Sequence, residues 1–200
     1  MKGTDVNESG SDFDDFTQCR LEFKLDVNPR YGEPSDYVLH YEGSVLSGEG
    51  FDQPVGTISI YVADLQQAYF EGQDPWEVLD SVDNGLAHFC SLISRKTGRF
   101  KRSVEYIVGS DIERLLIISH LFIDPEYRGS GLGLSAIDVA CKGLGNGAAA
   151  ALKAFPTQWE GCVVEDPKAF RRDRLKLMRY YQRVAFFPVL GDGLMARALF

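Results

Sequence analysis

The stretch from Leu115 to Leu134 constrains the fold of this chain more than any other. It begins with an apolar run that Pro125 ends, and three alternating glycines then precede a helical pattern. Such glycines let a backbone approach a bulky anion closely, and the first amides of a helix supply donors and the positive end of a dipole. We therefore expect a buried strand, a phosphate-binding loop and a helix in direct succession.

Two common phosphate-binding motifs do not fit this loop. A P-loop requires Lys followed by Ser or Thr after its glycines, and neither pair is present here. A dinucleotide fingerprint has the spacing G-x-G-x-x-G, and counting from Gly129 its last position is Leu134. A tight connection that binds nothing is the plain alternative, although three alternating glycines are costly for a simple turn.

Hydrophobic periodicity in the rest of the chain predicts an α+β fold, with a mostly antiparallel first half and a strand–helix–strand unit in the second. A hairpin is expected around Gly191-Asp192-Gly193. Strands are expected over 18–27, 37–41, 57–65, 104–108, 115–123 and 148–155. Helices are expected over 75–93, 131–144 and 168–183.

The organisation expected is one domain after a short arm. Residues 1–16 carry five acids and one lysine with Gly and Ser, which predicts a flexible acidic arm. Residues 17–200 are long enough to form a single domain with its own core. Because no run of 18 apolar residues occurs and the N-terminus lacks an apolar signal core, we expect a cytoplasmic protein without a membrane segment.

The charge of the chain is acidic but uneven. Its 21 Lys and Arg against 29 Asp and Glu give a net charge of −8, which argues against nucleic acid and anionic membranes as partners. Residues 168–183 nevertheless carry seven basic residues against one acid, Asp173. This helix is either a solvated face or a site for an anionic cofactor. The four cysteines form no CxxC pair, so free thiols and no metal site are expected.

The segment Arg128-Gly129-Ser130-Gly131-Leu132-Gly133 matches the R/Q-x-x-G-x-G/A signature and resembles the GNAT N-acetyltransferase superfamily. The resemblance implies a GNAT-like splayed, mixed and mostly antiparallel sheet with helices on both faces, and acetyl-CoA as co-substrate. It implies backbone contacts to the pantetheine arm from Leu121, Phe122 and Ile123. It implies pyrophosphate contacts from Arg128, Gly129, Ser130, Gly131, Leu132, Gly133 and Leu134.

A second segment, Leu177 to Phe186, resembles the L-Y-x-x-x-G-F pattern of the same superfamily. The resemblance implies that Tyr181 is the general acid toward the CoA thiolate. Ala185 stands where the pattern has Gly, and Tyr180 stands where it has Leu. The alternative is that Tyr181 packs in the core at helical spacing.

The residue that takes the proton from the acceptor amine is less constrained. His120 is a candidate because an imidazole can accept a proton near neutral pH, although the pattern favours a structural histidine that marks the bulge of the splayed strand. Glu105 and Glu113 are rivals of equal weight, and a water chain is a further alternative. The resemblance implies that a strand amide at a bulge, in the range His120 to Phe122, polarises the thioester carbonyl.

Together these observations predict an acetyl-CoA-dependent N-acetyltransferase. The acceptor is a small-molecule amine or a protein amine, and the acidic remainder of the chain suits a cationic one. A catalytically silent acyl-CoA-binding regulatory protein and a module for another phosphate ligand stay open as alternatives. A homodimer is compatible with each of them.

Overall fold

The computed structural model describes residues 17–26, 32–110, 112–159, 161 and 163–199, so the expected arm over 1–16 lies outside the described residues. Within them, seven strands form one sheet in the order β1-β2-β3-β4-β5-β7-β6. β4 and β5 are parallel, and the other neighbouring strands are antiparallel. The strands are β1 (Arg20–Asp26), β2 (Val38–Ser47), β3 (Gln53–Asp64), β4 (Arg114–Ile123), β5 (Ala148–Lys153), β6 (Phe187–Pro188) and β7 (Leu194–Ala198).

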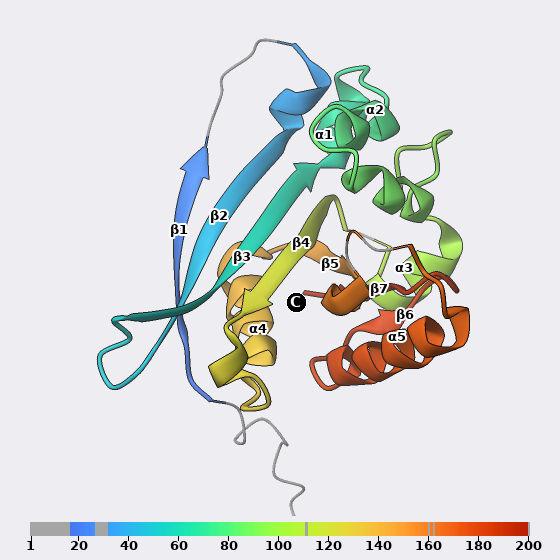
Figure 1. Ribbon diagram of the computed structural model, residues 1–200. Helices are drawn as coiled ribbons and strands as arrows, with labels where there is room; N and C mark the ends of the chain where they lie inside the picture. Colours follow the sequence, from blue (N-terminus) through green and yellow to red (C-terminus); the bar gives the residue numbers. More distant parts are fainter. Residues whose placement is uncertain (1–16, 27–31, 111, 160, 162, 200) are drawn as a thin grey trace, which may run out of the picture.

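Helices lie at both ends of the sheet. Figure 1 shows α1 and α2 at the end of the sheet where β3 finishes, while β4 finishes at the opposite end, next to the start of α4. The helices are α1 (Leu65–Phe70), α2 (Pro75–Asp80), α3 (Arg102–Val108), α4 (Leu132–Leu144) and α5 (Pro167–Gln182). Short 3-10 helices cover Pro34–Tyr37, Leu86–Leu92, Pro125–Tyr127 and Thr157–Trp159.

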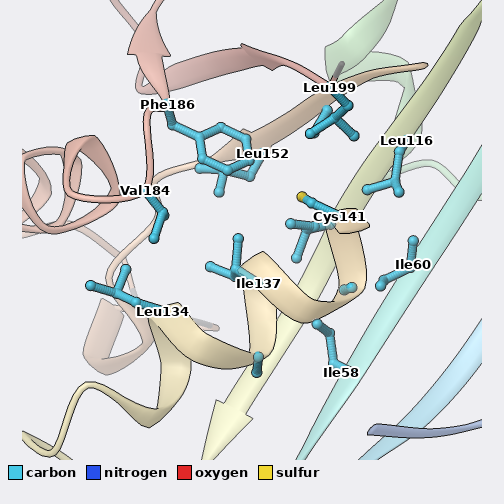
Figure 2. Packing of buried hydrophobic residues seen from close by; sticks show 14 of the residues in the cluster. Ile58, Ile60, Leu116, Leu134, Ile137, Cys141, Leu152, Val184, Phe186 and Leu199 are labelled. Atoms are coloured by element: carbon cyan, nitrogen blue, oxygen red, sulfur yellow. The ribbon is translucent and has the colours of Figure 1, made fainter. Parts of the chain in front are cut away.

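Both faces of the sheet are covered by helices. On β3, Ile58 and Ile60 belong to the core built with α4, whereas Tyr61 and Ala63 belong to the core built with α1, α2 and α3. Figure 2 shows Ile137 of α4 among the apolar side chains of the first core. The prediction of an α+β fold with an open, mostly antiparallel sheet is thereby confirmed.

The helix predicted over 75–93 is interrupted, so that prediction was wrong. α2 ends at Asp80, and a 3-10 helix begins at Leu86. Between them the Asp83 carboxylate accepts a hydrogen bond from the Gly85 amide at 2.6 Å, and the Asp83 carbonyl accepts one from the Leu86 amide at 2.9 Å. Local bonds of this kind compete with helix continuation.

The strand predicted over 104–108 is also wrong, because α3 occupies this segment. Val104 and Val108 are buried, whereas Tyr106 is 93% exposed. Residues four apart share one face of a helix, so the two valines fit a helix as well as they fit an alternating strand. Gly109, with φ of +98°, ends the helix.

A buried ion pair links α4 to the end of α5. Asp138 of α4 accepts a hydrogen bond from Arg197 Nη2 at 3.1 Å, and both side chains are nearly buried. Arg197 Nη1 donates to the carbonyl of Val184, which follows α5, at 3.0 Å. The two helices that border the site described next are therefore held to each other through β7.

Candidate functional site

β4 separates from β5 halfway along its length. It pairs with β5 over 114–118, and over 120–123 it pairs with β3 alone. Its register with β3 shifts at Ser119, whose hydroxyl donates to the Ser59 carbonyl at 3.1 Å. This bulge falls one residue before the range His120–Phe122 in which the resemblance implied it. The second half of β4 thus has one edge without a strand partner among the described residues.

A cleft of about 510 Å³ opens beside this free edge. Its walls are the end of β4, the loop and first turn of α4, one side of α5, and the segment 155–158. The volume lies within the roughly 300–1,000 Å³ of small-molecule sites. The lining residues are Leu121, Phe122, Ile123, Tyr127, Arg128, Gly129, Leu132, Gly133, Phe155, Pro156, Thr157, Gln158, Asp173, Lys176, Leu177, Tyr180 and Tyr181.

The loop between β4 and α4 brings backbone amides to one wall. Arg128 Nε donates to the Ile123 carbonyl at 2.8 Å, and the guanidinium lies 5.3 Å from the ring centre of Phe122. Gly129 and Gly131 have φ of +85° and +82°, a conformation that other residues adopt only with strain. Gly131 caps α4, whose first amides have no acceptor within the helix. This wall therefore suits an anion.

Two tyrosines of α5 line the opposite wall, with ring centres 5.7 Å apart. Burial raises the pKa of Tyr180, although a hydrogen bond with the Leu134 amide lowers it. Burial raises the pKa of Tyr181 to about 12, and the neighbouring Tyr180 adds to the rise. The Tyr181 hydroxyl therefore keeps its proton at neutral pH and can donate to a group in the cleft.

Particular residues define both ends of α5, the helix that carries these tyrosines. At its start, the Asp166 carboxylate accepts hydrogen bonds from the amides of Lys168 and Ala169, each at 3.0 Å. Just beyond its end, Ala185 adopts φ of +61°. Glycine takes this left-handed conformation most easily, so the position suits the glycine that the resemblance implied there.

The predicted cofactor-binding residues divide into two groups. Seven of the ten line the cleft, from β4, the loop and the start of α4. The other three shape the loop: Gly131 caps α4, Leu134 is fully buried, and the Ser130 hydroxyl donates to the Tyr127 carbonyl at 2.8 Å.

The seven basic residues of 168–183 do not form one site. Lys176 lines the cleft, and the other six do not. Arg174 instead donates to the carbonyls of Gly191 and Asp192. Asp173, which also lines the cleft, accepts a hydrogen bond from the Trp159 indole at 3.2 Å. This bond is the largest cause of the lowered pKa of the Asp173 carboxyl.

The candidate bases lie apart from the cleft. His120 lines a second cavity of about 600 Å³, which also includes Ser119, and Phe155 borders both cavities. Glu113 lines a third cavity of about 180 Å³, and Glu105 lies on α3. The structure thus brings His120, but neither glutamate, next to the free end of β4.

Sequence reasoning placed Tyr181 in the site, but it did not predict the wall formed by 155–158 or which side of α5 faces the cleft. Lys176, Leu177, Tyr180 and Tyr181 occupy positions i, i+1, i+4 and i+5, which share one side of a helix. This spacing could have indicated that the four side chains share one side of the helix. The segment 155–158 gave none, because a loop without periodicity does not reveal what it faces.

None of the helices in the described part of the chain has the length and apolar character needed to cross a membrane. A scan against protein-family models found no match, and searches of curated proteins and of solved structures found none either.

Proposed function

We propose that this protein is an acetyl-CoA-dependent N-acetyltransferase with a GNAT-like fold. One observation carries the proposal: the free edge of β4, the glycine loop at the start of α4, and a buried protonated tyrosine border the same cleft. A linear chain with amide groups can pair with a strand edge, and a pyrophosphate suits the first amides of a helix.

The residues fit the parts of acetyl-CoA in order. The amides of Gly129, Leu132 and Gly133 and the Arg128 guanidinium bind the pyrophosphate. Lys176 adds a cation on the opposite wall. The edge of β4 from Leu121 to Ile123 holds the pantetheine arm. The thioester then lies toward the bulge at Ser119, where β4 and β5 separate.

The reaction needs one proton to leave the amine and one to reach sulfur. The amine nitrogen forms a C–N bond to the acetyl carbon, and the C–S bond breaks with its electron pair on sulfur. Tyr181 donates its proton to the thiolate, and the nitrogen loses a proton to His120 or to water. Tyr181, whose pKa is raised to about 12, is protonated at neutral pH, so its hydroxyl is available to the sulfur as negative charge develops there.

The test is Tyr181→Phe, with Tyr106→Phe as control, because Tyr106 is 93% exposed on α3 and lies outside the cleft. Acetyl transfer is measured as thiol release from acetyl-CoA with a panel of amines, and the dissociation constant of acetyl-CoA by calorimetry. Removing a general acid typically lowers turnover about 100-fold or more. We expect that loss in Tyr181→Phe with nearly unchanged acetyl-CoA affinity, and unchanged turnover would exclude Tyr181 from the reaction.

Two further measurements separate the alternatives. A regulatory protein would bind acetyl-CoA and release no thiol with any amine. A module for another phosphate would be stabilised by ATP or NAD rather than by CoA, because a specific ligand raises the melting temperature by mass action.

A further inference from the structure

The second cavity lies next to the bulge of β4 and is lined by charged and aromatic side chains. It has a volume of about 600 Å³, and Ile118, Ser119 and His120 bring it to the point where β4 leaves β5. Phe155 separates it from the first cleft by bordering both. Under the proposed function this cavity receives the acceptor, so its side chains indicate the class of amine.

Two carboxylates converge at one end of this cavity, around Tyr61. Burial raises the pKa of Tyr61 most, and the charges of Asp83 and Glu42 raise it further. Glu42 is held in place by His40, whose Nε2 lies 2.8 Å from the carboxylate. The His40 ring in turn stacks on Tyr61 with centres 4.2 Å apart. The two carboxylates give this end of the cavity a negative charge, which suits an organic ammonium group.

The register of the sheet fixes how far this anionic end lies from the bulge. Glu42 of β2 pairs with Ser59 of β3, and Ser59 pairs with His120 of β4. Paired residues point to the same face of a sheet, and neighbouring strands are about 4.8 Å apart. The backbone of Glu42 therefore lies about 10 Å from that of His120.

The opposite end of the cavity carries a cation. Lys153 ends β5 directly after Leu152, which pairs with Ile118, and Lys153 lines the cavity at the level of Ser119. A fixed ammonium next to a bound amine disfavours the protonated form of that amine. The reacting nitrogen is thus kept as a neutral nucleophile near the bulge, while a second ammonium is favoured near Glu42.

We propose that the acceptor is an aliphatic diamine whose far ammonium is bound by Glu42 and Asp83 while its near amino group reacts beside Ser119 and His120. This inference rests on the proposed function. The near nitrogen forms the C–N bond and loses one proton, sulfur leaves with the C–S electron pair and gains one proton, and the far ammonium stays unchanged. Its alkyl chain lies along Leu86, Phe89 and Phe155.

The first experiment compares cadaverine with pentylamine at constant ionic strength, following thiol release from acetyl-CoA. The two amines differ in the far amino group. We expect kcat/KM for cadaverine to exceed that for pentylamine at least tenfold, which corresponds to about 1.4 kcal/mol. Equal values for the two amines would overturn the diamine inference and leave acetyl transfer itself intact.

The second experiment locates the site of the far ammonium. In the double variant Glu42→Gln, Asp83→Asn, we expect KM for cadaverine to rise about tenfold, and KM for pentylamine and for acetyl-CoA to change less than about twofold. Glu49→Gln is the matched control, because Glu49 is exposed and lies outside both cavities. An unchanged KM for cadaverine in the double variant would refute the assignment of these carboxylates.

A binding measurement separates this inference from the proposed function. Cadaverine is titrated by calorimetry into the protein saturated with CoA, and we expect binding that the double variant weakens about tenfold. Absence of cadaverine binding would overturn the diamine inference. Binding of CoA and of cadaverine without thiol release from acetyl-CoA would overturn the proposed function and retain the ammonium site.

Discussion

Adding one methyl group at Gly131 or at Gly133 tests the loop at the start of α4, because the two positions lie two residues apart in different conformations. Gly131 has φ of +82°, whereas Gly133 is the second residue of α4 and has no positive φ. Alanine at Gly131 would adopt a left-handed conformation, which costs about 1–2 kcal/mol. A stiffer unfolded chain offsets up to about 1 kcal/mol of this cost.

Alanine at Gly133 meets no backbone strain, and its cost depends on the neighbours of the added Cβ. The added Cβ would lie 3.3 Å from the Tyr180 hydroxyl, 3.6 Å from Leu121 Cδ2 and 3.7 Å from Ile123 Cγ1. The last two distances are ordinary contacts, and the hydroxyl at the end of Tyr180 needs to move by a few tenths of an ångström. Alanine in a helix is favoured over glycine by about 1 kcal/mol. We expect Gly133→Ala to be neutral or slightly stabilising.

The two variants should therefore differ by about 1–2 kcal/mol in the free energy of unfolding, with Gly131→Ala the less stable. For a chain of this size such a difference separates the melting temperatures by about 2–8 °C. Urea unfolding measures the free energies, and calorimetry with CoA measures the accompanying loss of affinity in Gly131→Ala. If both variants match in stability within about 0.3 kcal/mol, the reasoning from φ is refuted.

Three further predictions concern the end of α5 and the tyrosine in the cleft. Ala185→Gly removes the strain of the left-handed conformation at φ of +61°, so the free energy of unfolding measured in urea should rise by up to about 1 kcal/mol. A clear loss of stability would contradict this. Arg197→Met removes one of the two cationic partners of the Asp138 carboxylate and leaves Lys142, so the same assay should show a loss of about 1–3 kcal/mol. The double variant Asp138→Asn, Arg197→Met should recover part of this loss, and no recovery would contradict a direct pairing. Burial raises the pKa of Tyr181 from 10.0 to about 12, so its contribution to stability is complete below pH 10 and falls as pH rises toward 12, by up to about 3 kcal/mol. Tyr181→Phe should lack this loss, and identical pH curves for the two proteins would contradict the burial argument.

The parts of the fold that were predictable from the sequence are those with strong local signals. The apolar run of β4, the alternating glycines and the amphipathic pattern of α5 each lie within about twenty consecutive residues, and their elements match the predicted ranges closely. The strand predicted over 104–108 failed because two valines four residues apart fit both periodicities.

The second cavity was beyond sequence reasoning for a different reason. Glu42 and His120 are separated by most of the first half of the chain, and the register of three strands brings them to one face. Asp83 joins them because its turn interrupts the predicted helix over 75–93. Neither the strand register nor the interruption of the helix can be predicted from local composition.

The separation of β4 from β5 also has a consequence for association between molecules. Unpaired strand edges at the rim of a sheet attract strands of other chains, which leads to aggregation. Here the unpaired edge over 121–123 lines the cleft, and α5 and the segment 155–158 form its other walls. Because these walls flank the edge, a strand from another chain has restricted access to it. The fold therefore leaves backbone groups of β4 unpaired without forming a long open edge at the rim of the sheet.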